Sequence, residues 1–187
     1  NIDSDPQART FSGNIVFPGF TAPKLAWVAA NEPDVFSKVA SVMLPKDYVV
    51  WWLTGRYVTE MSDAAGTAWP DVGARAWSDD LIALGGMRRD QMPDLLEGSD
   101  VVGEVQSARA DLGLPSTCKV IAGGADNAVA ACGVGALGEG QGFVSLGTSG
   151  VVLAGRDTYA PLPASAVHTF CHAVPARWYQ MGVVLAA

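Results

Sequence analysis

The sequence predicts an α/β fold, and two observations support this class. Segments with helical spacing and short apolar strand-like segments both occur in the first 137 residues, and strand-like segments dominate from residue 143 onward. Hydrophobic residues make up 49% of the 187 residues and charged residues only 17%, so the chain can bury a core and is not disordered. We therefore expect one domain and the start of a second, with a boundary near residues 138–142.

Helices are predicted where turn-forming residues precede apolar residues at helical spacing. One begins near Pro23, because proline suits the first helical turn. Another is opened by Pro45 and ended by Gly55, and a third is capped by Ser78. The further helical segments expected are 31–43, 105–112 and 126–137. The polar residues 1–13 predict an extended lead-in.

Strands are predicted where short apolar runs are bounded by turn residues. Residues 57–59 and 119–122 fit this pattern, and the second run is expected to be buried. The runs 143–146 and 151–154 flank a Gly-rich turn, which predicts a hairpin. Two more strand-like segments, 167–174 and 178–185, follow. Residues 62–69 are expected to form strand and turn.

Charge and cysteine content limit the expected partners and the expected location of the protein. The net charge of −7 disfavours nucleic acid and anionic membrane, which both attract clustered Lys and Arg. The three cysteines are too few and too scattered for a disulfide framework, which favours a cytoplasmic location. No apolar run reaches the roughly 20 residues of a membrane span. The chain starts without Met and stops within an apolar run, so we expect a piece of a longer protein.

The segment 122–127, Ala-Gly-Gly-Ala-Asp-Asn, is the strongest candidate for chemistry. Asp126 stands at a predicted helix start, where Asp is a common N-cap. The helix dipole also favours a negative charge there, and an aimed carboxylate can accept a proton from a hydroxyl group. Asn127 could hydrogen bond to a polyol. Capping and catalysis are compatible roles, and position alone does not choose between them.

The second candidate is the turn Gly147–Gly150 between two strands. Glycine and serine are ordinary turn residues, so a plain hairpin is one interpretation. The other is that backbone N–H groups and the Thr148 and Ser149 hydroxyls face a phosphate. The P-loop pattern is not present in the sequence.

Two further patterns are weaker. Gly133–Gly138 fits the G-x-G-x-x-G pattern, but it closes a predicted helix instead of opening one, which disfavours dinucleotide binding. His168 and His172 lie on a predicted strand, where four residues span about 13 Å, too far to share a metal ion. We therefore predict that both histidines lie in the core or support a site from outside it, and that no residue ligates a metal.

Together, these segments resemble the FGGY family of carbohydrate kinases, and within it the members that phosphorylate D-xylulose. The motifs that carry the resemblance run in the same order over nearly the whole chain. They are Gly13–Leu25, Leu44–Tyr48, Ser62–Thr67, Gly123–Asn127, Ser145–Gly150 and Val167–His172.

The resemblance implies an actin-like, ribonuclease H-like ATPase fold, present in part. Residues 1–139 would be the later part of the N-terminal, sugar-binding domain, and residues 140–187 would begin the C-terminal, ATP-binding domain. Asp126 would be the catalytic base and Asn127 would contact the ketose, while Gly147, Thr148 and Ser149 would line the phosphates of ATP bound with Mg²⁺. A small sugar is the expected partner, and a homodimer is the candidate assembly.

The same resemblance implies segments that this sequence lacks. These are a D-x-G-T phosphate loop, an early group of sugar contacts and a Gly-rich adenine site. We therefore expect the chain alone to phosphorylate sugar inefficiently. The alternatives that stay open are a kinase of ribulose, gluconate or glycerol, a dinucleotide-binding module, and a non-catalytic module.

Overall fold

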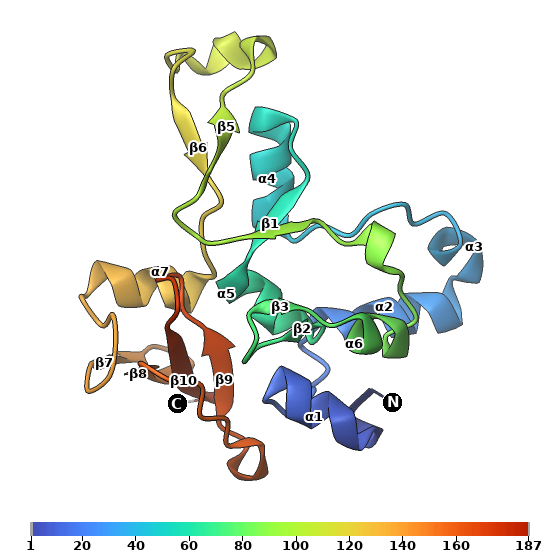
Figure 1. Ribbon diagram of the computed structural model, residues 1–187, viewed down its shortest axis with the longest axis vertical. Coiled ribbons are helices and arrows are strands. Elements are labelled where there is room, and N and C mark those ends of the chain that lie inside the picture. The colour runs from blue at the N-terminus through green and yellow to red at the C-terminus, as the bar shows by residue number, and fades with distance from the viewer. Residues whose placement is uncertain (1, 187) are drawn as a thin grey trace.

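The computed structural model describes residues 2–186, whose elements form three lobes around a short central helix (Figure 1). One lobe is an arm built from α4, β5 and β6, and the second holds α7 and the β7–β10 sheet. The third holds α1, α2, α3 and α6. The central helix is α5, Met61–Ala64, which follows β1 directly. The lobes therefore meet around the segment that includes Ser62 and Asp63.

The elements follow one another closely along the chain. The α-helices are α1 (Pro6–Ser12), α2 (Thr21–Asn31), α3 (Pro33–Phe36), α4 (Pro45–Thr54), α5 (Met61–Ala64), α6 (Asp79–Leu84) and α7 (Asp126–Gly133). The 3-10 helices are η1 (Ile2–Ser4), η2 (Ala65–Thr67), η3 (Arg89–Gln91), η4 (Ser107–Leu112) and η5 (Pro163–Ser165). The strands are β1 (Val58–Glu60), β2 (Pro70–Asp71), β3 (Ala76–Trp77), β4 (Asp94–Leu96), β5 (Val101–Glu104), β6 (Lys119–Ile121), β7 (Gly142–Leu146), β8 (Gly150–Arg156), β9 (His168–Cys171) and β10 (Trp178–Val184).

The largest sheet has the strand order β7-β8-β10-β9, and all of its pairings are antiparallel. The predicted hairpin is present, with Leu146 opposite Gly150 across the turn. The other strands form three two-stranded pairs: β1 with β4 in parallel, and β2 with β3 and β5 with β6 antiparallel. Both secondary-structure types predicted for the fold class are therefore present.

The helix ends at which a capping residue was predicted agree with the structure. Gly55 ends α4 with φ of 75°, a left-handed conformation that glycine adopts without steric penalty. Ser78 caps α6 by accepting a hydrogen bond from the Leu81 amide. Asp47 accepts a hydrogen bond from the Leu44 amide, which satisfies one of the free donors at the start of α4.

Several predicted elements are wrong or misplaced. Residues 1–13 are not extended, because Asp5 caps α1 and Pro6 opens it. The helix expected over 31–43 is limited to the four residues of α3. Residues 62–67 are helical, because Glu60 caps α5. The strand around Val120 is largely exposed, since it pairs only with β5. The α7 helix ends at Gly133, four residues before the predicted end.

One hydrophobic cluster joins the residues before 139 to those after it. It contains Trp69, Leu81 and Ala128 together with Leu153 and Phe170. Polar contacts add to this connection. The Asn14 side chain donates to the Thr169 carbonyl and accepts from the Thr169 amide, each at 2.8 Å. The sheet is thus packed directly onto the earlier part of the chain.

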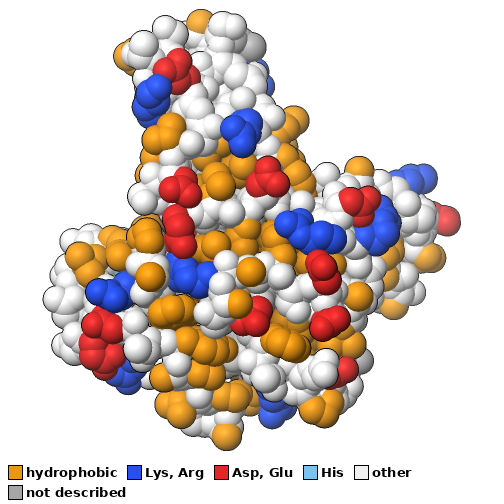
Figure 2. Space-filling view, in the orientation of Figure 1, with side chains coloured by type: hydrophobic (Ala, Val, Ile, Leu, Met, Phe, Trp, Pro, Cys, Tyr) orange, Lys and Arg blue, Asp and Glu red, His pale blue; other side chains and the backbone are white. Residues whose placement is uncertain are grey.

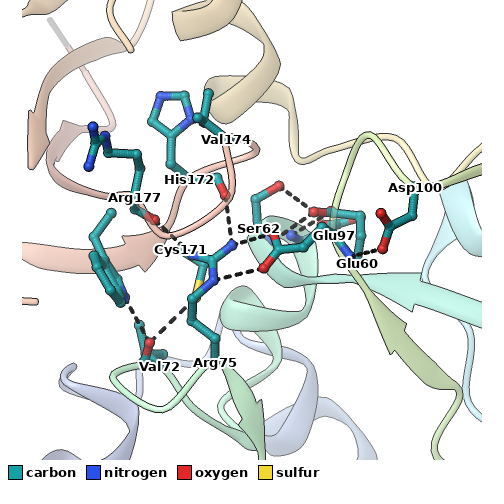
Figure 3. Close-up of polar contacts among 12 residues, drawn as sticks. Glu60, Ser62, Val72, Arg75, Glu97, Asp100, Cys171, His172, Val174 and Arg177 are labelled. Atoms are coloured by element: carbon teal, nitrogen blue, oxygen red, sulfur yellow. Dashed lines mark hydrogen bonds and ion pairs between the residues drawn. The ribbon is translucent and has the colours of Figure 1, made fainter. Parts of the chain in front are cut away.

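Arg75 makes a second connection between these parts (Figure 3). Its guanidinium pairs with both oxygens of Glu97 and donates to the Arg177 carbonyl at 2.7 Å. Bidentate Arg–carboxylate pairs of this kind fix the relative orientation of the two side chains and also pair their charges. The Trp178 indole N–H donates to the Val72 carbonyl beside it, at 2.8 Å.

The surface has mixed charge. On the face drawn in Figure 2, Lys and Arg side chains are dispersed among acidic ones and form no single basic patch. None of the helices within residues 2–186 combines the length and apolar character needed to cross a membrane. The three cysteines are free, and Cys171 is the buried one.

Candidate active site

Asp126 is the first residue of α7, and Ala125 occupies the N-cap position. The N-cap role considered for Asp126 is therefore wrong by one residue. Its Oδ1 accepts hydrogen bonds from the Asn127 amide at 2.6 Å and from Asn127 Nδ2 at 3.1 Å. Within residues 2–186, no hydrogen bond to Oδ2 is formed. The carboxylate is exposed and keeps one oxygen available to accept a proton.

The turn that carries Asp126 is held by side chains from distant elements. We call residues 122–126 the base-bearing turn. The Ala125 amide donates to Ser62 Oγ at 2.9 Å, and the Ser62 hydroxyl donates in turn to Glu60 Oε2 at 2.8 Å. Glu60 also accepts from the Ser62 and Asp63 amides. A fully buried carboxylate thus holds the N-cap of α7 through one hydroxyl group. Figure 3 shows Ser62 beside Glu60.

Lys46 holds the other end of the base-bearing turn. Its Nζ donates to Asp47 Oδ1 at 2.6 Å and to the Ala122 carbonyl at 3.4 Å. The same Nζ lies 3.8 Å from Glu60 Oε1 and 3.9 Å from Asp63 Oδ2. Of the residues that the structure describes, Lys46 alone forms ion pairs with these three carboxylates.

Burial and crowding change the acidity of this carboxylate cluster. Burial raises the pKa of the Glu60 carboxyl, against the opposing effects of Lys46 and of the hydrogen bonds from Ser62. Burial also raises the pKa of Asp63 to about 6, and the negative charges of Glu60, Asp47 and Asp126 add to this shift.

Glycines allow the base-bearing turn to fit tightly. Gly123 has φ of 93°, a conformation that other residues rarely adopt. A Cβ added at Gly98 would lie 2.5 Å from the Gly123 carbonyl oxygen and 3.1 Å from that of Ala173. A Cβ at Gly124 would lie 2.5 Å from Val129 Cγ1. The backbone beside Asp126 is thus packed too closely for side chains at these positions.

The turn formed by Gly147, Thr148 and Ser149 connects β7 to β8 and is exposed. Its internal hydrogen bond runs from the Gly147 amide to the Ser149 carbonyl at 2.9 Å. The Thr148 and Ser149 hydroxyls make no hydrogen bond within residues 2–186, so both are available to a ligand. Within the same residues, no hydrogen bond or ion pair joins this turn to Asp126 or Asn127.

The weaker candidates have structural roles. Gly133 ends α7, so the G-x-G-x-x-G pattern does not open a helix, as predicted. His172 is buried, and burial lowers its pKa. Its Nε2 donates to the Ala136 carbonyl at 3.1 Å and its Nδ1 accepts from the Val174 amide, an arrangement that requires the neutral ring. His168 stacks on Phe170. Within residues 2–186, no group of three His, Cys, Asp or Glu side chains is arranged to hold a metal ion.

Sequence reasoning missed Lys46, Glu60 and Ser62 as parts of the site. Lys46 and Ser62 lie in motifs that carried the family resemblance, but nothing in their local pattern indicates contact with residues 122–125. A weak signal exists for Glu60, because an acid two or three residues before a helical Ser-Asp pair fits an N-cap.

Comparison with known proteins identifies the class of protein. Solved structures of xylulose kinases match the chain well, which confirms the predicted class, an actin-like ATPase fold present in part. A model described as the N-terminal domain of the FGGY family of carbohydrate kinases matches residues 3–133. That match covers more than half of the chain, so the chain belongs to the FGGY family of carbohydrate kinases.

Individual relatives make the likeness more specific. A xylulose kinase of Escherichia coli (strain K12) is 48% identical over 97% of this chain. A solved structure titled as a "xyloylose kinase" from Brucella ovis matches with a TM-score of 0.96 and 53% identity over 100% of the chain. The xylulose kinase structure from Rhodospirillum rubrum has a TM-score of 0.90 at 27% identity. This chain spans 38% of the first relative's length and 39% and 37% of the two solved chains.

Proposed function

We propose that the protein containing this chain transfers the γ-phosphoryl group of ATP to a hydroxyl group of D-xylulose. The observation that carries the proposal is the Asp126 carboxylate, exposed at the start of α7 and aimed by a buried network of side chains. The 48% identity to a protein described as a xylulose kinase supports the choice of sugar. Phosphorylation of a sugar at this site accounts for the exposed Asp126 carboxylate and for the identity to a xylulose kinase.

In this mechanism Asp126 acts as the base. Its free Oδ2 accepts the proton of the sugar hydroxyl while the hydroxyl oxygen forms a bond to the γ-phosphorus. The bond from that phosphorus to the β–γ bridging oxygen breaks, and ADP is released. Phosphoryl transfer requires mainly positioning of the hydroxyl, so the base does not need a high pKa. Asn127, held against Asp126 by its side-chain amide, is placed to contact the ketose.

The 147–149 turn is the proposed site for the phosphates of ATP. Its free hydroxyls and exposed backbone fit an anionic ligand, because oriented N–H and O–H donors favour phosphate oxygens. Mg²⁺ is expected to arrive bound to the phosphates, since this ion usually keeps several waters and few protein ligands. Residues 140–187 would then begin the ATP-binding domain and residues 1–139 would belong to the sugar-binding domain.

The decisive experiment compares two Asp→Asn variants of the protein encoded by the complete gene. Asp126 and Asp79 are each the first residue of a helix and are both exposed. We expect Asp126→Asn to lower kcat for D-xylulose by about 10³-fold or more, because the base is lost. Asp79→Asn should keep wild-type kcat. Equal activity of the two variants would reject Asp126 as the base.

Substrate choice requires a panel of sugars. ADP release should be fastest with D-xylulose among D-xylulose, D-ribulose, gluconate and glycerol. A faster rate with another member of the panel would reassign the substrate while keeping the reaction. The 187-residue chain by itself should show little turnover, and full turnover would contradict the need for further segments. A homodimer stays a prediction, which light scattering would check.

A further inference from the structure

The Ser62 hydroxyl connects the buried carboxylate of Glu60 to the turn that carries Asp126. Ser62 lies in α5, where three lobes of the molecule meet (Figure 1). It is buried, and its Oγ both donates to Glu60 and accepts from Ala125. Ala125 directly precedes Asp126 in the chain.

The direction of these hydrogen bonds has a chemical consequence. A hydroxyl group that donates to a carboxylate becomes a better acceptor, since hydrogen bonds in a chain polarise one another. Glu60 accepts three hydrogen bonds, from the Ser62 amide, the Ser62 hydroxyl and the Asp63 amide, at 2.7 to 2.8 Å. The acceptor that holds the Ala125 amide is therefore itself fixed in position and orientation.

The hydrogen bond from the Ala125 amide to Ser62 joins residues 63 positions apart in the sequence. Within residues 2–186, no backbone carbonyl accepts from the Ala125 amide. Ala125 is the N-cap of α7, and its methyl side chain cannot accept a hydrogen bond from the first turn. The turn is tied elsewhere by the Gly123 amide, which donates to the Gly98 carbonyl at 2.9 Å, and by Lys46 at the Ala122 carbonyl. Of these three contacts, the one made by Ser62 is nearest to Asp126 in the sequence.

We propose that Ser62, held by Glu60, is the positioning residue that fixes the Asp126 carboxylate for proton transfer. This inference rests on the proposed function, because it assigns to Asp126 the role of base. Ser62 does not contact the reacting atoms. Loss of its hydroxyl lets the Ala125 amide, and with it the start of α7, move relative to the bound sugar. Displacement of a catalytic group by about 1 Å can slow a reaction about 100-fold.

The test compares Ser62→Ala with Ser78→Ala in the protein encoded by the complete gene. Ser78 is a matched control, because its hydroxyl also accepts a hydrogen bond at the start of a helix, α6. Both variants should lower Tm, and Ser62→Ala should lower it more, because it also removes a hydrogen bond from the fully buried Glu60. We expect kcat for D-xylulose to fall about 10- to 100-fold in Ser62→Ala only, with the KM for ATP unchanged. Equal kcat in the two variants would overturn the inference.

A second measurement does not depend on activity. Hydrogen exchange of the peptide covering residues 122–128 should accelerate in Ser62→Ala and stay unchanged in Ser78→Ala, because the Ala125 amide loses its acceptor. Unchanged exchange in Ser62→Ala would overturn the positioning role even if kcat falls. Absence of sugar-dependent ADP release by the unsubstituted protein would instead reject the proposed function, and the exchange experiment would still decide whether Ser62 orders the turn.

Discussion

The base-bearing turn and the 147–149 turn differ in what holds them. The first is tied at both ends by side chains from α4 and α5, and those side chains are tied to buried carboxylates. The second is held by the hairpin ladder and one hydrogen bond within the turn, and its side chains are exposed. One turn is fixed by the tertiary structure and the other by its own strands.

This difference matches what each turn is proposed to bind. A base must meet one hydroxyl group in one orientation, which requires a rigid support. A triphosphate offers many equivalent oxygens, so exposed donors on a hairpin are sufficient to bind it. Substitutions around the base-bearing turn should therefore change stability strongly, whereas those in the 147–149 turn should change mainly nucleotide affinity.

The largest expected effect comes from Lys46→Met. This change leaves Asp47 and Glu60, both almost fully buried, without their cation. Breaking a buried ion pair in this way costs about 3–5 kcal/mol. Lys119→Met is the control, since it removes an exposed pair with Glu104 that contributes about 0–1 kcal/mol. Urea unfolding measures both changes, and equal losses would show that the Lys46 cluster gives no special support.

Gly98→Ala should have the next largest effect. Its Cβ would collide with the backbone carbonyls of Gly123 and Ala173, which cannot move as a flexible side chain could. We expect a loss of about 1–3 kcal/mol from overpacking. Gly133→Ala is the control, because a Cβ there meets nothing within 4 Å. If thermal unfolding finds both variants as stable as the wild type, the base-bearing turn is less tightly packed than described.

An effect of similar size depends on pH. Because the pKa of Asp63 is about 6 in the folded state and lower in the unfolded chain, the folded state binds more protons between about pH 4 and 6. Asp63 therefore lowers the free energy of unfolding as pH rises through this range. Asp63→Asn should gain about 1–3 kcal/mol relative to the wild type between pH 4.5 and pH 7.5. Chemical unfolding at the two pH values measures this gain, and a constant difference would contradict it.

The smallest effect on stability is expected at Thr148. Thr148→Val removes an exposed hydroxyl that has no partner within residues 2–186, so the free energy of unfolding should change by less than about 0.5 kcal/mol. The KM for ATP should rise about tenfold, because one hydrogen bond to phosphate is lost. Thr158→Val, at an exposed threonine after β8, should leave the KM unchanged. Steady-state kinetics would refute the assignment if the two variants behave alike.

Local chemistry predicted much of the fold. The boundaries of α4 and α6 and the β7–β8 hairpin followed from Pro45, Gly55, Ser78 and the Gly-rich turn, because capping and turn formation act over a few residues. Tertiary contacts decided the elements that were wrong. The α1 helix is supported by Ala8, which packs in the core, and the polar composition of residues 1–13 gave no sign of this burial.

The candidate site was predictable only in part. The Asp126 position came from a Gly-rich turn before an Ala-rich helix, a pattern visible within about ten residues of sequence. Lys46 is 76 residues from Ala122, and Ser62 is 63 residues from Ala125. A charged or hydroxyl side chain in isolation is most often solvated, so the network around the base required the structure.

The two hydrogen bonds between Asn14 and Thr169 have a consequence for dividing the chain. They join segments 155 residues apart, on either side of the proposed boundary near residue 139. A backbone cleaved there would keep its halves together without a covalent link, since the buried Asn14 side chain bonds to β9 through both its nitrogen and its oxygen and one hydrophobic cluster spans the boundary. Fragments 1–139 and 140–187 should therefore reassemble when mixed, as in a split reporter, and each fragment alone should be prone to aggregate.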